Sequence, residues 1–160
     1  LPTYPVSVTM TSGMFFSVAV YNSVGPWNES LFLDYVDHEY CLRARAKGYT
    51  IFETKKTVLL HQRGRLTQHQ IGRWHFSTTN HDYQRRYYMM RNRLYVYRMY
   101  GRQFPLWMAN DLLKWGREST KILLVESDKT KKMIAQGKGL LDFLRGRFGK
   151  LGAAKQDQPQ

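Results

Sequence analysis

The hydrophobic and polar positions of the chain change character near residue 83. Before that point, apolar and β-branched residues stand in runs over 6–20, 49–52 and 57–60, and these runs predict strands. Gly13 breaks the first run, where we expect the backbone to approach another group closely, although a simple bulge would explain the glycine equally well. A turn at Lys55-Lys56 is expected to join the second and third runs.

Two short helices are predicted in the same part of the chain. The first covers 18–24 and stops at the breaker pair Gly25-Pro26. The second runs from Asp37, the expected N-cap, to Lys47, and Gly48 stands where a helix C-terminus favours glycine. Strands and helices of this length predict a mixed α/β region.

A helical pattern takes over in the second half. The polar residues 62–82 predict a long loop, and apolar residues then recur at steps of three and four, which predicts helices over 83–101, 105–125 and from Asp128 onward. In the third helix we expect an apolar leucine face, solvated lysines, and a bend at two glycines. The apolar positions are Ile134, Leu140, Leu141 and Leu144, the lysines are Lys131, Lys132 and Lys138, and the glycines are Gly137 and Gly139.

Composition limits the possible classes of protein. With 160 residues, 42% of them hydrophobic and 14% aromatic, the chain can form one folded domain with its own core. Cys41 is the only cysteine, which excludes an internal disulfide and a cysteine-rich zinc site and favours the cytoplasm. The spacings of four histidines fit no zinc finger, so these residues do not indicate a zinc site either: His38, His69, His75 and His81.

The ends and the apolar runs of the chain suggest neither export nor a membrane span. No charged leader precedes an apolar run, so no signal peptide is expected, and the first residue, Leu1, favours excision from a longer chain. The best apolar run is interrupted by Asn110, Asp111 and Lys114, well short of the roughly 20 residues of a spanning helix.

Charge is distributed unevenly. The net charge is +13, and residues 1–60 hold five acids and five bases, so the whole excess lies in residues 61–160. A surface this basic attracts polyanions, and nucleic acid, anionic lipid headgroups and nucleotide diphosphates all qualify. Charge alone does not choose among these partners.

The stretch 34–44 carries the most specific chemistry. Asp37 at the start of a helix would stay ionised, because the helix N-terminus favours negative charge, and could accept a proton from a hydroxyl. Most aspartates at such positions only cap the helix, and this alternative stays open on the residues alone.

The surrounding motifs resemble the family 2 glycosyltransferases, which have a GT-A fold, and the rhamnosyltransferases among them in particular. The resemblance extends from about residue 7 to 150. It rests on Ser12-Gly13, on Gly25 to Glu29, on Asp34 to Ala44, on Leu60-His61, and on the later stretches 85–93 and 139–146.

The resemblance implies an α/β fold: the C-terminal half of a GT-A domain, followed by a basic helical region. The expected parts are a catalytic part over 1–82 with the acceptor side and the base, basic amphipathic helices over 83–148, and a flexible tail over 149–160. No Asp-x-Asp pair occurs in the chain. The donor site and the metal pair are therefore expected in a missing N-terminal half, without which the fragment would be inactive.

The implied reaction is an inverting transfer of a sugar, rhamnose by resemblance, from a nucleotide-diphosphate donor to a lipid-linked or polysaccharide acceptor in cell-surface glycan synthesis. Asp37 matches the catalytic base. His61 matches a position that helps hold a divalent metal, Mg or Mn, although a structural histidine is an equal alternative. Ser12, Gly13, Asp34 and Glu39 would shape the substrate pocket, and the two acids could equally pair with nearby arginines.

Two alternatives to an enzyme remain: a basic module that binds membrane or nucleic acid, and an inactive scaffold. The tyrosine and arginine stripe of the helix over 83–102, with Trp107 and Trp115, fits either packing on the core or an anionic membrane interface. No nucleic-acid motif is present, so no nucleic acid is expected as a partner. The expected location is the cytoplasm, peripheral on the inner face of the plasma membrane.

Overall fold

The computed structural model describes residues 3–57, 59 and 67–152, and the structural statements below concern these residues. The elements in chain order are β1 (Thr3–Val6), α1 (Val18–Val24), a 3-10 turn (Glu29–Leu31), α2 (Val36–Ala46), β2 (Ile51–Thr54), β3 (Thr67–Ile71), β4 (Trp74–Thr78), α3 (Tyr83–Tyr100), α4 (Pro105–Val125) and α5 (Lys129–Leu144).

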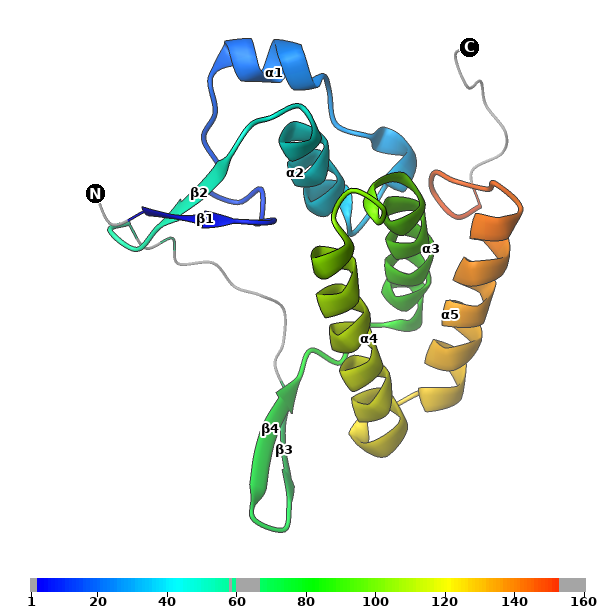
Figure 1. Ribbon diagram of the computed structural model, residues 1–160. Coiled ribbons are helices and arrows are strands. Elements are labelled where there is room, and N and C mark those ends of the chain that lie inside the picture. Colours follow the sequence, from blue (N-terminus) through cyan, green and yellow to red (C-terminus); the bar gives the residue numbers. More distant parts are fainter. Residues whose placement is uncertain (1–2, 58, 60–66, 153–160) are drawn as a thin grey trace.

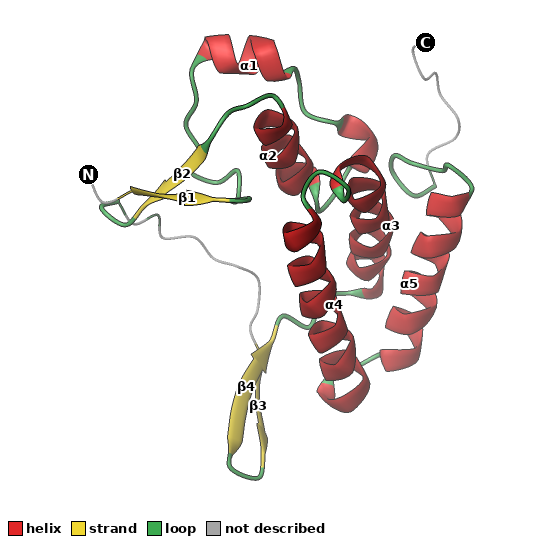
Figure 2. Ribbon diagram, viewed as in Figure 1, coloured by secondary structure: helices red, strands yellow, loops and turns green. Residues whose placement is uncertain are grey.

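The helices form the body of the molecule. In Figure 1, α3, α4 and α5 run up, down and up beside one another, and α2 lies at the end where α3 passes into α4. The two antiparallel sheets, β1 with β2 and β3 with β4, have two strands each and lie outside the helical body (Figure 2). A buried cluster joins the start of α2 to α3 and α4, and its members are Tyr35, Leu42, Val96, Tyr100 and Trp107.

The ends of α1 and α2 follow local capping chemistry. The Ser17 side chain accepts a hydrogen bond from the Val20 N–H (3.3 Å), and Gly25 follows at φ 92°, so the helix predicted over 18–24 is confirmed. At the end of α2, the Tyr49 N–H reaches the Ala44 carbonyl (3.1 Å), with Gly48 at φ 89°. This is a Schellman motif, and it explains the glycine.

The start of α2 differs from the prediction. The helix begins at Val36, its N-cap is Tyr35 in the left-handed conformation, and no side chain caps it. Asp37 therefore lies in the first turn and is not the N-cap. The backbone turns here without help from a capping side chain, and a capping pattern in the sequence could not show this.

The strands also differ from the prediction. The strand over 6–20 is wrong: β1 ends at Val6, and a turn closed by the Met14 N–H on the Thr11 carbonyl (3.0 Å) places Gly13 at φ 78°. β2 pairs with β1, from Val6 opposite Ile51 to Thr3 opposite Thr54. The predicted strand 57–60 is not found at Thr57 and Leu59, and its other two residues lie outside the described ones.

The predicted loop over 62–82 contains a hairpin. β3 and β4 pair from Thr67 opposite Thr78 to Ile71 opposite Trp74, around a turn with Gly72 at φ 58°. These strands are polar, so a pattern of apolar runs does not predict them. At the start of the predicted flexible tail, the Gly149 N–H bonds the Ser30 carbonyl (2.7 Å) and the Leu151 N–H bonds the Tyr88 hydroxyl (2.6 Å); residues 153–160 of the tail lie outside the described ones.

The three long helices are confirmed, but α5 is oriented differently from the prediction. Lys132 is 2% exposed, whereas the leucines expected to form the buried face are exposed. Gly139 lets α5 approach α3 closely, because a Cβ there would lie 2.5 Å from the Tyr87 carbonyl oxygen. The glycine therefore serves close packing, and the expected bend does not explain it.

The tyrosine and arginine stripe of α3 is buried in its first half and exposed at its end, at Arg98 and Arg102. Tyr88 and Arg91 are buried, and the Arg91 guanidinium lies 5.0 Å from the Tyr88 ring centre. Trp107 is buried as well, and Trp115 donates a hydrogen bond to Gln136 on α5 (2.8 Å). Of the two alternatives for this stripe, packing on the core is the one observed for these residues.

Candidate functional site

Asp37 lies in the first turn of α2, with 27% of its side chain exposed. Its Oδ1 accepts a hydrogen bond from the backbone N–H of His38 (2.9 Å) and lies 3.1 Å from the His38 ring Nδ1. The His38 ring in turn stacks on Tyr35, with ring centres 4.8 Å apart. Asp37 is therefore held on one side and reaches solvent on the other.

The surroundings of Asp37 keep it ionised. Partial burial disfavours the charge, but the hydrogen bond and the charge interaction with His38 outweigh burial, and the pKa of the Asp37 carboxyl is lowered from its ordinary value. The amides of the first helical turn also favour a negative charge. A carboxylate in this state can accept a proton from a substrate hydroxyl.

The segment that leads into α2 has an unusual backbone. Phe32, Asp34 and Tyr35 have φ values of 58°, 59° and 64°, a region that residues other than glycine rarely adopt. Such a conformation costs free energy at each residue, so the surrounding structure must impose it. Strain of this kind is concentrated at functional sites.

Asn92 on α3 holds this segment by its backbone. Its side-chain amide nitrogen lies within donating distance of the carbonyl oxygens of Leu31 (2.7 Å), Leu33 (2.6 Å) and Asp34 (3.0 Å). Asn92 is fully buried, and Arg91 adds a hydrogen bond to the Leu31 carbonyl (3.2 Å). The strained turn is therefore fixed by donors that come from a long helix.

Side chains anchor the same segment. Arg85 on α3 forms a forked pair with the Asp34 carboxylate, with Nε–Oδ2 and Nη2–Oδ1 distances of 2.9 Å each. The hydroxyl of Tyr35 donates to Asp111 Oδ2 on α4 (2.7 Å). The position of Asp37, two residues later, thus depends on α3 and α4 together.

Asp111 is the centre of a buried polar cluster. Its Oδ2 also accepts hydrogen bonds from the Tyr97 hydroxyl (2.8 Å) and from Arg93 Nε (3.0 Å). Burial opposes ionisation of Asp111, but the positive charge of Arg93 and the three hydrogen bonds outweigh it, so the pKa of this carboxyl is lowered. The cluster ties Tyr35 to both helices.

The other predicted pocket residues are placed as follows. Glu39 is buried, accepts a hydrogen bond from the Tyr100 hydroxyl (2.8 Å) and pairs with Arg43 (3.1 Å). Both Asp34 and Glu39 thus pair with an arginine, the alternative considered for them above. Ser12 and Gly13 lie in an exposed turn and form no hydrogen bond with Asp37 in the described part of the chain.

The residues that position Asp37 were missed as site residues. In the sequence, Asn92 and Arg85 stand out only as part of the stretch 85–93, which resembles the glycosyltransferases. Asp111 stands out only because it interrupts an apolar run. The sequence carries no local signal for them, because arginine and asparagine are ordinary residues of a solvated helix face.

The divalent metal that the resemblance implies is expected only together with the missing N-terminal half, so the described residues do not test it. Among the described residues, no group of three or more His, Cys, Asp or Glu side chains is placed to hold a metal ion. The proposed ligand His61 lies outside the described residues. Mg²⁺ and Mn²⁺ need several oxygen ligands, so no step of the chemistry below is assigned to a metal.

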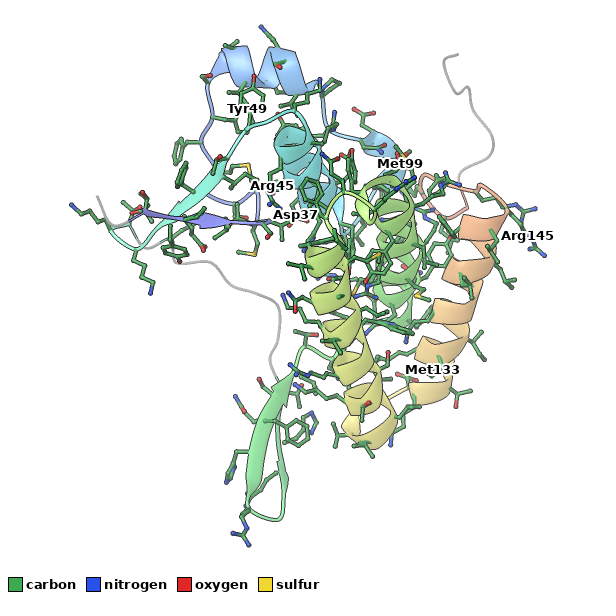
Figure 3. All side chains as sticks on the ribbon, in the orientation of Figure 1. Asp37, Arg45, Tyr49, Met99, Met133 and Arg145 are labelled. Carbon is green, nitrogen blue, oxygen red and sulfur yellow. The ribbon has the colours of Figure 1, made fainter. Side chains whose placement is uncertain are left out.

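A cavity of about 350 Å³ opens at the other end of α2. Its lining includes Arg45, Tyr49 and Phe104, and the Arg45 guanidinium lies 4.6 Å from the Phe104 ring centre. Asp37, which Figure 3 labels with Arg45 and Tyr49, does not line this cavity; it precedes Arg45 by eight residues along α2, roughly 12 Å by helical rise.

No helix in the described part of the chain combines the length and the apolar character needed to cross a bilayer.

The chain is similar to a protein of Shigella flexneri named dTDP-rhamnosyl transferase RfbF. The two are 30% identical over 144 residues, which cover 89% of this chain and 47% of the Shigella protein. The chain thus spans about half the length of the relative that it matches. No protein-family model and no solved structure matches the chain. The similarity supports a relationship to a glycosyltransferase.

Proposed function

We propose that this chain is the acceptor-side half of an inverting glycosyltransferase of family 2 with a GT-A fold, and that Asp37 is its catalytic base. The observation that carries the proposal is an ionised aspartate, open to solvent, at the end of a strained segment that buried side chains hold in place. The similarity to a dTDP-rhamnosyl transferase supports the reaction class.

The proposed reaction transfers a sugar from a nucleotide diphosphate to an acceptor hydroxyl. The hydroxyl oxygen attacks the anomeric carbon from the face opposite the leaving group. The bond from that carbon to the diphosphate oxygen breaks, and the nucleoside diphosphate leaves with the electron pair. Asp37 takes the hydroxyl proton, and because the attack comes from the face opposite the leaving group, the new glycosidic bond has inverted configuration.

The residues around Asp37 act by positioning it. Asn92 and Arg85 fix the backbone and the side chain of the preceding segment, and Asp111 fixes Tyr35. A carboxylate that must meet a hydroxyl in line with a leaving group loses efficiency when it moves by about 1 Å. These anchors therefore have a functional purpose beyond stability.

The donor site is proposed to lie in residues beyond this chain. The chain matches 47% of the Shigella protein, which leaves room for a second half of similar size. That half would supply the nucleotide site and the acidic ligands of a divalent metal. The two-stranded sheet of β1 and β2 has open edges and an exposed Phe52, and two strands alone are marginally stable, so further strands would extend it.

Rhamnose is the proposed donor sugar, and a lipid-linked or polysaccharide acceptor at the inner face of the plasma membrane is the proposed acceptor. The support for the donor is the name of the Shigella relative. The test is release of the nucleoside diphosphate, with and without acceptor, from a panel of nucleotide sugars, by the longer protein that carries both halves. Acceptor-dependent release from dTDP-rhamnose is expected. Release from no nucleotide sugar would reject the proposed function.

A further inference from the structure

A broad apolar surface lies on the outer side of α4 and α5, and we name it the leucine face. Every member is at least 38% exposed, so none is part of the core. The leucine face consists of Leu112, Leu113, Leu123 and Leu124 on α4 and Met133, Ile134, Leu140, Leu141 and Leu144 on α5. Clusters of exposed apolar side chains this large mark interaction sites on folded proteins.

Polar contacts explain why these residues point outward. On α5, Lys132 forms an ion pair with Glu126 (2.8 Å), and Asp142 accepts a hydrogen bond from the Tyr87 hydroxyl (2.9 Å). On α4, Glu118 pairs with Arg86 of α3 (3.0 Å). The polar sides of both helices are thus turned toward the protein, which leaves the leucines on the opposite side.

The α4 and α5 parts of the leucine face lie on the same side of the helix pair. The two helices run antiparallel and meet through the hydrogen bond of Trp115 with Gln136. On α4, Asp111 and Glu118 bond to α3, and on α5, Asp142 does so. By helical periodicity the leucines lie on the opposite sides of the same two helices, away from α3. Figure 3 labels Met133 and Arg145 at opposite ends of α5, the length over which the face extends.

A row of cations borders the leucine face. Lys131, Lys138 and Arg145 recur every seven residues on α5, and all three are exposed. Lys138 and Arg145 form no ion pair within the described residues, and Lys131 pairs with Asp128 (3.1 Å). Ten bases and five acids lie between residues 105 and 150, and three of the acids are buried: Asp111, Glu126 and Asp142.

We propose that the leucine face binds the surface of an anionic lipid bilayer. Helices with an apolar side and bordering cations lie in the interface plane, where leucines enter the acyl boundary and lysines and arginines meet the headgroups. Binding there would bring the protein to the surface that holds the lipid-linked acceptor of the proposed function.

Charge favours a bilayer over a second copy of the chain. In a symmetric dimer through this face, the leucines would pair, but the cationic rows would lie near each other with few acids to neutralise them. Nucleic acid would meet the cations and leave nine apolar side chains in water. An anionic bilayer satisfies both the cations and the leucines.

The test is co-sedimentation of the 160-residue chain with vesicles of phosphatidylglycerol and phosphatidylcholine, or of phosphatidylcholine alone. We expect binding to the anionic vesicles only. The double variant Lys138→Glu/Arg145→Glu should weaken binding at least about tenfold, since each basic residue contributes to attraction by anionic lipid. Lys56→Glu/Arg73→Glu is the matched control with the same charge change, because both residues are exposed and lie outside α4 and α5: Lys56 follows β2, and Arg73 is in the turn between β3 and β4. It should weaken binding less than threefold.

The apolar part of the proposal is tested with Leu140→Asp/Leu144→Asp in the same assay, with circular dichroism to verify folding. A tenfold or greater loss is expected. Equal binding by the charge variant and its control would contradict the proposal, as would no binding of the original chain. A concentration-dependent dimer that the leucine variant breaks, without vesicle binding, would assign the face to a second copy. Vesicle binding does not depend on sugar transfer, so either proposal can fail alone.

Discussion

At the scale of single residues, Asn92 of the basic helix α3 holds the backbone of the segment that leads into α2. Its side-chain nitrogen, with two N–H groups, lies within hydrogen-bond distance of three carbonyl oxygens in the segment before α2. A buried carbonyl left without a donor costs about 1–3 kcal/mol. Asn92 is therefore one of the groups that hold the strained segment, together with Arg85 and Asp111.

We expect Asn92→Asp to lower the free energy of unfolding by about 3 kcal/mol or more, because a carboxylate cannot donate to carbonyl oxygens and would repel them. Urea unfolding followed by circular dichroism measures the change. Asn110→Asp is the matched control, since Asn110 is exposed on α4, and it should change stability by less than about 0.5 kcal/mol. Equal effects of the two substitutions would remove Asn92 as the anchor.

Asp111 makes stability depend on pH in acid. Its folded-state pKa lies below the ordinary value of about 4, so its contribution is complete above that pH and is lost as the pH falls through the folded-state pKa. Asp111→Asn should cost about 3 kcal/mol at pH 7, because Arg93 loses its buried partner.

The cost of Asp111→Asn should shrink as the pH falls below about 4, and unfolding curves at several pH values measure this. Asp128→Asn is the control, because Asp128 is exposed, and its cost should stay under about 1 kcal/mol throughout. A cost for Asp111→Asn that is constant from pH 7 to 3 would mean that the carboxylate charge has no part in holding the cluster.

At the scale of elements, the closest helix contact depends on one of two neighbouring glycines. Gly139 faces the α3 backbone, whereas a Cβ at Gly137 would meet nothing within 4 Å. Gly139→Ala should destabilise the protein by about 1–3 kcal/mol, because α5 must move away from α3. Gly137→Ala should instead stabilise it by about 0.5–1 kcal/mol, because alanine loses less conformational entropy than glycine when the helix forms.

Thermal unfolding of the two alanine variants compares the same change in the same helix. A lower midpoint for Gly139→Ala with a higher midpoint for Gly137→Ala is the expected pair of results. If both variants shift the midpoint in the same direction, the close approach of α5 to α3 is not as described.

The helices could be predicted from the sequence better than the strands. Asp82 caps α3, Pro105 starts α4 and Gly48 closes α2, and each acts through local chemistry. The strands depend on partners distant in sequence, so the pairing of β1 with β2 left no local signal. The hairpin over 67–78 is polar, and apolar runs could not reveal it.

The orientation of α5 shows why helix faces were misassigned. A hydrophobic pattern predicts buried leucines, but here ion pairs and a glycine contact turn the polar side inward.

For the site, Asp37 could be found from the motif, because its chemistry lies in neighbouring residues. Its anchors Asn92 and Asp111 lie 55 and 74 positions away along the chain, and only the fold brings them together.

At the scale of the whole molecule, the helical body has two surfaces with different proposed roles. One carries Asp37, at the start of α2 beside the open sheet of β1 and β2. The other is the leucine face of α4 and α5, on the side away from α3. The proposed function uses the first surface for transfer and the second to hold the protein where a lipid-linked acceptor is found.

The most direct test of the proposed function is the transfer rate of Asp37→Asn in the longer protein that carries both halves. An amide keeps the size of the side chain but cannot take the proton, so the rate should fall by about 10²- to 10⁴-fold. The unfolding midpoint should change little. Asp128→Asn, the same substitution at an exposed acid on α5, should leave the rate within twofold. A transfer rate of Asp37→Asn equal to that of the unaltered protein would show that Asp37 is not the base.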